Sequence, residues 1–222
     1  MEGMGRVPAF LLTYNTLSAT VCTKNNMKIK PEILEWSYLM NRLAILTVGK
    51  THSGKTTFAN ALEKELANSV VIDQDNHAEF LHTYYQSLLP KQGSNTIKYA
   101  ITQAIVNHAV HETNCHLILC NSNRNRRGRL RLIDFYQKNG FTCILVNFDL
   151  PDHILKERIA NGQRSKKILR VASNFAEVLS RQDTETNTGD IVAPNDEEAD
   201  HVFVIKKADE VQSVIQKIVD IV

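Results

Sequence analysis

The eight residues Gly49–Thr56, GKTHSGKT, constrain the fold of this chain more than any other stretch. They fit the spacing G-x-x-x-x-G-K-[ST] of a P-loop, in which backbone N–H groups of a glycine-containing loop surround phosphates. The apolar run Leu43–Val48 precedes the motif and indicates a buried strand, and apolar residues recur at a helical spacing from Phe58 onward. Strand, loop and helix N-terminus in this order predict a site for a nucleoside triphosphate, with ATP the expected donor.

Two side chains of the motif have expected roles of their own. Lys55 is expected to reach the β- and γ-phosphates, and the hydroxyl of Thr56 to bind Mg²⁺. The residues of this stretch that we expect to contact ATP are Gly49, Lys50, Thr51, His52, Ser53, Gly54, Lys55, Thr56 and Thr57.

Length and composition bound the class of protein. The chain has 222 residues, enough for one α/β domain, and its 26 basic and 24 acidic residues neither favour nor exclude a nucleic-acid partner. Its four cysteines form no C-x-x-C pair and no zinc spacing, so we expect a reduced, cytoplasmic protein. No apolar run approaches the length of a membrane span, and we expect no membrane partner.

Four further stretches have the character of strands, and helical stretches separate them. The expected strands are 69–73, 116–120, 141–148 and 201–205. The expected helices are 80–89, 97–110, one from Leu130 to Gly140, one after Pro151 and 208–222, and 183–200 is expected to be a loop. This alternation predicts an α/β P-loop NTPase fold, a five-stranded parallel sheet with helices on both faces. We expect residues 41–222 to form this domain and 1–40 to be an N-terminal extension, poorly ordered or the product of an early start assignment.

A pair of carboxylates follows the second expected strand. Asp73 and Asp75 stand at the carboxyl end of that strand, the edge at which ligands bind in open α/β sheets. A single acidic residue there could be a helix cap, but two in D-x-D spacing after a P-loop unit favour function. Asp73 is the expected second residue of the Mg²⁺ site.

The one strong charge cluster follows the third expected strand. Five arginines fall within residues 124–131, where a run of charges is usually a solvated face. Because the neighbouring strands carry the phosphate loop and the acidic pair, we favour anion binding. The residues expected to bind the acceptor are Asn121, Asn123, Arg124, Arg126 and Arg127.

At this point the chain resembles the P-loop kinases, and most closely the phage-type 5′-polynucleotide kinases. The similarity runs from about Leu43 to about Ile205. It is carried by four stretches in order: ILTVGKTHSGKTTFA, CNSNRNRRGRLRLIDFYQKNGFTC, FDLPDHILKERIANGQR and PNDEEADHVFVI. The resemblance implies that Asp75 is the general base and that Arg164, with Arg158 nearby, is the lid arginine that stabilises the transferring phosphoryl group.

The resemblance implies a kinase that transfers the γ-phosphoryl group of ATP to an alcohol, with the 5′-hydroxyl of a nucleic acid as the expected acceptor. Three departures keep an alternative open. Asn121 replaces an aspartate, Ala78 stands where polynucleotide kinases hold the acceptor phosphate with an arginine, and Asp73 replaces a neutral residue. Asp73 and Ala78 favour the alternative, a small-molecule or nucleotide-sugar kinase of the kind of zeta toxins and shikimate kinase, and a small anionic acceptor is the other possible partner. A non-catalytic or hydrolytic nucleotide switch is the third and least favoured interpretation.

Overall fold

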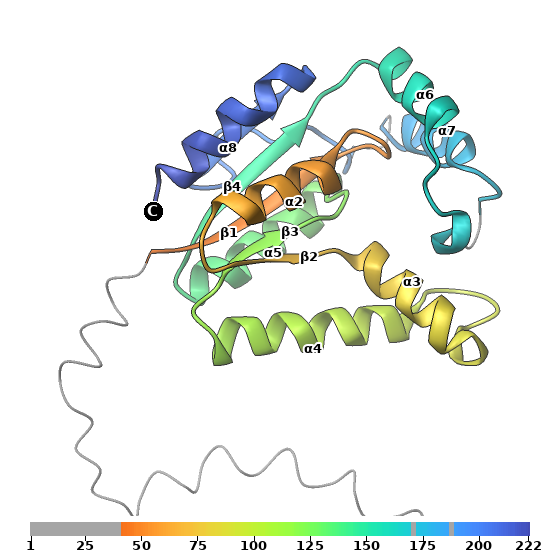
Figure 1. Ribbon diagram of the computed structural model, residues 1–222, viewed down its shortest axis with the longest axis horizontal. Helices are drawn as coiled ribbons and strands as arrows, with labels where there is room; N and C mark the ends of the chain where they lie inside the picture. The colour runs from red at the N-terminus through yellow and green to blue at the C-terminus, as the bar shows by residue number, and fades with distance from the viewer. Residues whose placement is uncertain (1–40, 170–171, 187–188) are drawn as a thin grey trace, which may run out of the picture. The chain divides into compact units, whose positions relative to one another are not determined.

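The computed structural model describes residues 41–169, 172–186 and 189–222, without the side chain of Lys167. One parallel sheet has the strand order β2-β3-β1-β4-β5. Its strands are β1 (Arg42–Gly49), β2 (Ser69–Ile72), β3 (His116–Leu119), β4 (Phe141–Phe148) and β5 (His201–Ile205). The predicted fold, a five-stranded parallel sheet with helices on both faces, is confirmed (Figure 1). The expected extension, residues 1–40, lies outside the described residues.

Two helices, α3 and α5, begin earlier than the sequence pattern predicted, and α7 was not predicted. They are α2 (Lys55–Glu65), α3 (Gln74–Tyr84), α4 (Thr96–Glu112), α5 (Arg126–Lys138), α6 (Asp152–Asn161), α7 (Phe175–Glu185) and α8 (Val211–Val219), with 3₁₀ turns η1 (Gln86–Leu88), η2 (Lys166–Ile168) and η3 (Ala208–Glu210). Side-chain caps explain the earlier starts. Asp73 accepts the N–H of Asp75 at the start of α3, and Asn125 accepts the N–H of Gly128 at the start of α5. Most of the arginine run therefore belongs to a helix, and α7 extends into the expected loop 183–200.

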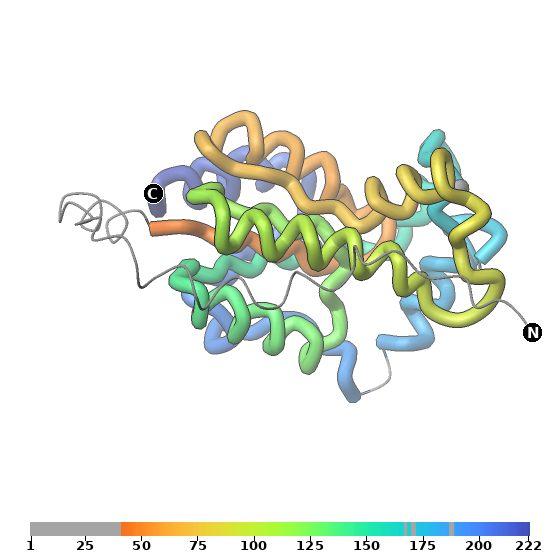
Figure 2. Tube along the Cα trace, turned by 90° about the horizontal axis from the view of Figure 1, so that it is seen from below, coloured from red at the N-terminus to blue at the C-terminus, as the bar shows by residue number. Residues whose placement is uncertain are grey.

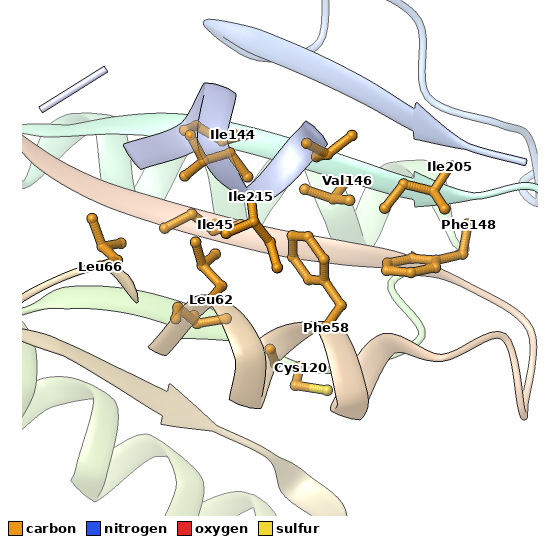
Figure 3. Close-up of a cluster of buried hydrophobic side chains, with 14 of the residues drawn as sticks. Ile45, Phe58, Leu62, Leu66, Cys120, Ile144, Val146, Phe148, Ile205 and Ile215 are labelled. Carbon is orange, nitrogen blue, oxygen red and sulfur yellow. The ribbon is translucent and has the colours of Figure 1, made fainter. Parts of the chain in front are cut away.

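The buried core consists of two layers, one on each face of the sheet. Along β1, Leu43 and Ile45 pack with α2 and α8, while Ala44, Leu46 and Val48 pack with α4 and α5. Strands covered on both faces are apolar without alternation, which explains the continuous apolar run of β1. Figure 3 shows the first layer, in which the ring of Phe58 meets that of Phe148 edge-on at 5.5 Å.

The carboxyl ends of the strands are flanked by α3 on one side and by α6 and α7 on the other (Figures 1 and 2). β1 pairs with β3 along one edge and with β4 along the other, so the strand order reverses at β1. Ligand crevices of open α/β sheets form at such a reversal. Within the described ranges, no helix combines the length and the apolar character needed to cross a membrane.

Candidate active site

The loop between β1 and α2 has the backbone that its glycines allow. Gly49 has φ 150°, and a Cβ there would come within 3.0 Å of the Cβ of Phe148. Gly54 has φ 101° and precedes α2 with no side-chain cap on the helix N-terminus. His52, between them, also has a positive φ of 58°. The uncapped N–H groups of α2 and the tight loop leave an anion-binding cradle.

Lys55, at the first position of α2, folds back over this loop. Its ammonium donates to the carbonyl of Lys50 and, at 3.2 Å, to the hydroxyl of Ser53. Burial lowers the pKa of Lys55 to about 8. A phosphate group placed in the loop would supply the negative charge that this ammonium lacks.

Thr56 and Asp73 form a pair of oxygen ligands beside the loop. The hydroxyl of Thr56 donates to one carboxylate oxygen of Asp73 at 3.2 Å, and the other oxygen accepts the N–H of Asp75 at 2.8 Å. Asp73 is 3% exposed. The thiol of Cys120, next to this pair, donates to the Thr56 hydroxyl at 3.5 Å, and burial, with a smaller contribution from Asp73, raises the pKa of Cys120 to about 11. The thiol is therefore neutral and leaves the hard oxygen donors as the metal-ligating groups.

Asp75 faces the cleft from the first turn of α3. Its carboxylate forms an ion pair with the guanidinium of Arg164, with 2.5 Å between Oδ2 and Nη2. Arg164 lies between α6 and η2, and its guanidinium carbon is 5.2 Å from the ring centre of Phe175. The structure thus brings together the residue expected to be the base and the residue expected to act on the phosphoryl group.

A second arginine approaches the phosphate loop directly. Arg158, in the last turn of α6, donates to the carbonyl of His52 at 3.2 Å. A Cβ added to Gly54 would lie 3.4 Å from the same guanidinium. The ring of His52 in turn meets the ring of Phe175 edge-on at 4.7 Å. Arg158 therefore lies beside the loop residues that are expected to contact ATP.

The same loop is tied to α6 and α7 by polar bonds. The ammonium of Lys50 lies 2.7 Å from a carboxylate oxygen of Asp152 and 2.7 Å from one of Asp183. The N–H of Thr51 donates to the side-chain oxygen of Gln182 at 2.8 Å. These contacts join the phosphate loop to the lid, by which we mean residues 152–185 as far as they are described.

The side chains of Lys55, Thr56, Asp73, Asp75, Arg158 and Arg164 line one cleft of about 1160 Å³. The model of the AAA domain family matches residues 45–183, more than half of the chain. The chain belongs to this family. No curated protein matches this AAA domain chain with significant similarity.

Solved structures share the fold of this AAA domain. The APS kinase of Mycobacterium tuberculosis, solved with AMPPNP and APS, is 15% identical, with 82% of this chain and 96% of that chain covered and a TM-score of 0.51. Kti12 of Chaetomium thermophilum, solved with ADP-AlF3, is 16% identical, with 80% and 97% covered and a TM-score of 0.54. The shikimate kinase of Bacteroides thetaiotaomicron is 13% identical, with 81% and 97% covered and a TM-score of 0.50. At these identities the likeness establishes a common P-loop kinase fold.

The residues expected to bind the acceptor are not gathered in the cleft of the AAA domain. Of that set only Asn121 lines it. Asn123 donates its side-chain amide to the carbonyl of Thr47 at 2.9 Å and so supports the end of β1. Arg124 is 10% exposed and donates to the carbonyl of Gln182 and the hydroxyl of Thr186, both at 2.6 Å. Arg124 therefore holds α7 in place.

Three further arginines of the cluster contact carboxylates of residues 190–198. Arg126 contacts Glu198 at 3.2 Å, and Arg127 contacts Asp190 at 3.5 Å. Arg129, buried in full, holds Glu198 with two hydrogen bonds of 2.7 and 3.1 Å. The favoured interpretation of this run as an acceptor site lacks support from the structure, because Arg126 and Arg129 share Glu198, Arg127 contacts Asp190 at the surface, and the side chains of Arg124, Arg126 and Arg127 do not line the cleft.

The cleft also contains residues that the sequence pattern did not identify. Phe175 and Gln182 come from α7, which was not predicted. Asn95, Lys98 and Tyr99 come from the start of α4, on the side of the cleft where α3 carries Asp75. The helical period of α4 was visible in the sequence, but nothing local shows that its first turn reaches the site.

Proposed function

We propose that this AAA domain transfers the γ-phosphoryl group of ATP to an alcohol group of a small-molecule acceptor. The observation that carries the proposal is the meeting of four groups in one cleft: the Lys55 loop, the Thr56–Asp73 pair, Asp75 and the lid arginines. Kinases are the function that needs all four, because phosphoryl transfer depends on positioning and on neutralising charge.

The donor side follows from the loop. The N–H groups at the start of α2 and the ammonium of Lys55 bind the β- and γ-phosphates. Thr56 and Asp73 offer one hydroxyl and one carboxylate side by side, and this fits Mg²⁺, which takes few protein ligands and keeps several waters. A Mg²⁺ ion held by these two residues would supply positive charge to offset that of the phosphates.

The acceptor side follows from Asp75. Its carboxylate orients the acceptor hydroxyl and takes the hydroxyl proton as the oxygen bonds to the γ-phosphorus. The bond from that phosphorus to the β,γ-bridging oxygen breaks at the same time, and ADP leaves with the electron pair. Arg164 exchanges its partner, from the Asp75 carboxylate to the transferring group, before this step.

The internal pairing of the arginine cluster is the reason for choosing a small acceptor over a nucleic-acid 5′ end. A nucleic-acid 5′ end would need cations that are free to neutralise several backbone phosphates. Arg124, Arg126 and Arg127 are each paired with groups of their own chain.

A γ-labelled ATP transfer screen tests the proposal. The acceptors are sugars, nucleosides, anionic small alcohols and 5′-hydroxyl DNA and RNA. We expect label on a small alcohol, a loss of about 10²-fold or more in Asp75→Asn, and little change in Asp134→Asn, a matched carboxylate on the outer surface of α5. Label released only as inorganic phosphate, or equal transfer by Asp75→Asn, contradicts it. Label on oligonucleotides, with a log–log salt slope of about −0.7 per phosphate contacted, would instead identify a nucleic-acid acceptor.

A further inference from the structure

The start of α4 places unused hydrogen-bond donors and a positive charge on the Asp75 side of the cleft. Asn95, the N-cap of α4, lines the cleft and is 7% exposed. Its side-chain oxygen accepts the N–H of Lys98 at 3.3 Å, which fixes the amide nitrogen as the atom left over. Among the described residues no acceptor pairs with that nitrogen. The residue as a whole is buried, but this nitrogen keeps access to solvent in the cleft and is therefore available to donate to a group bound there.

Lys98, one turn further along α4, has no carboxylate at ion-pair distance among the described residues. Its ammonium lies over the ring of Tyr99, 4.8 Å from the centroid, and both residues line the cleft. Tyr99 is 51% exposed although it is aromatic. Lys50, Lys55, Arg158 and Arg164 each contact a carboxylate or a carbonyl, whereas Lys98, at the start of α4, has no such partner among the described residues and can bind an anion.

Lys98 lies on α4 where that helix packs against α3, the helix whose first turn carries the residue expected to be the base. His77, two residues after Asp75, forms a hydrogen bond of 2.8 Å with the hydroxyl of Thr102, and that hydroxyl donates to the carbonyl of Lys98 at 3.0 Å. Burial lowers the pKa of His77 and the positive charge of Lys98 lowers it further, against the opposing effect of Asp73. The ammonium of Lys98 is therefore close to His77 of α3, and Asp75, on another face of the same helix, lines the same cleft as Lys98.

We propose that Asn95, Lys98 and the N-terminus of α4 form a subsite for an anionic group of the acceptor. The acceptor is then an alcohol that carries a phosphate, sulfate or carboxylate at the end away from the reacting hydroxyl, with the Tyr99 ring against its body. The proposed function is needed only to say that the bound anion belongs to the acceptor. The N–H groups of α4, the Asn95 amide and the Lys98 ammonium all favour negative charge.

Sulfate is the probe that tests the subsite without any catalysis. The full chain, labelled with ¹⁵N, is saturated with AMPPNP and Mg²⁺ so that the phosphate loop is filled. Sodium sulfate is then titrated against sodium chloride of equal ionic strength, and the backbone amide resonances are followed. We expect saturable shifts centred on residues 95–99 and on the facing turns of α3. Lys98→Ala should weaken the binding at least tenfold and Asn95→Ala a few-fold, while Lys91→Ala, which removes an exposed lysine outside the cleft, should leave it unchanged.

Two results overturn the inference: no saturable shift at the start of α4, or the same sulfate affinity in Lys98→Ala as in Lys91→Ala. Shifts centred on Arg126 and Arg127 instead would overturn it as well. Melting temperatures of the variants, measured alongside, separate lost binding from lost fold.

The two proposals fail separately. Sulfate binding at α4 without transfer to any alcohol would remove the proposed function and leave the anion subsite. Transfer to neutral alcohols with no sulfate binding would remove the anion subsite and leave the proposed function. Where transfer to an anionic alcohol is found, Lys98→Ala should raise the KM for that alcohol at least tenfold and leave the KM for its neutral counterpart and for ATP unchanged.

Discussion

Arg129 is the largest side chain among those that the described chain encloses fully. Its guanidinium has two bonds to Glu198 and further bonds to the carbonyls of Asn123, Arg124 and Val192. Burial alone would raise the pKa of Glu198, but hydrogen bonds from Arg129 and Arg126 outweigh it and hold that pKa below its usual range. A single buried ion pair therefore fixes the loop after β3 to the segment before β5.

Removing one member of this pair should destabilise the fold strongly. Glu198→Ala leaves a buried guanidinium without its partner and should lower the free energy of unfolding by about 3–5 kcal/mol. Glu197→Ala, the exposed neighbour, should cost less than about 0.5 kcal/mol. Because the pKa of Glu198 is lowered in the folded state, its stabilisation is present at neutral pH and is lost as the pH falls through that pKa. Urea denaturation at several pH values measures this, and equal costs for the two variants would contradict it.

Lys55 should make nucleotide affinity depend on pH. Its pKa of about 8 in the free protein means that Lys55 loses its proton above that pH. When phosphates are bound, their negative charge keeps Lys55 protonated to a higher pH. Binding then takes up a proton, so AMPPNP affinity should fall by up to about tenfold per pH unit above 8. Lys55→Ala should abolish phosphoryl transfer, retain the fold and lose this pH dependence. Calorimetry and a melting curve check it, with Lys64→Ala as control; a loss of stability typical of a core truncation would contradict it.

At the scale of elements, the ion pair of Asp75 and Arg164 joins the start of α3 to the chain after α6. Both side chains are partly exposed, at 47% and 34%, so the pair contributes only about 0.2–1 kcal/mol. Under the proposed function, this weak ion pair opens before Arg164 can contact the transferring phosphoryl group.

Asp75→Asn should therefore affect affinity and rate in opposite directions. Removing the carboxylate frees Arg164, so AMPPNP should bind about 1.5- to 5-fold more tightly while transfer falls by about 10²-fold or more. Glu79→Gln, one turn along the same helix, should leave AMPPNP affinity unchanged. Fluorescent nucleotide competition measures the AMPPNP affinity of both variants, and the labelled-ATP assay measures transfer. Weaker AMPPNP binding by Asp75→Asn would show that the ion pair does not compete with the donor.

The elements that the sequence predicted correctly are those with a local signal. The apolar runs of the strands and the glycines of the phosphate loop are examples, because burial on both faces and positive φ act on short stretches. α7 also has a local signal, because Asn174 and Glu177 form an N-terminal cap with hydrogen bonds of 3.0 Å. Its apolar stripe is short, and the helix was not predicted. The arginine cluster could not be interpreted from its own sequence, because its partners at residues 190–198 come from a distant part of the chain.

At the scale of the whole molecule, the cleft lies at the carboxyl end of β1, between the helices α3 and α4 on one side and α6 and α7 on the other. The α3–α4 side carries Asp75 and Lys98, and the α6–α7 side carries Arg158 and Arg164. The described residues of the two buried layers all lie between 43 and 221.

A chain that begins at Met40 should consequently fold and bind nucleotide as well as the full chain does. Residues 1–39 show no periodic apolar face. Thermal unfolding and AMPPNP titration of the two chains compare them directly. An insoluble or markedly less stable shorter chain would show that the first 39 residues contribute to the core.

The two ion pairs of Lys50 couple the position of the phosphate loop to the positions of α6 and α7. One ammonium in the phosphate loop touches the first turn of α6 through Asp152 and the end of α7 through Asp183, so loop position and lid position change together. Thermodynamic reciprocity then applies: phosphate that stiffens the loop must slow hydrogen exchange in α7, and substitutions that loosen α7 must raise the dissociation constant of the nucleotide. Nucleotide binding at the phosphate loop and the local stability of α7 are therefore expected to depend on each other.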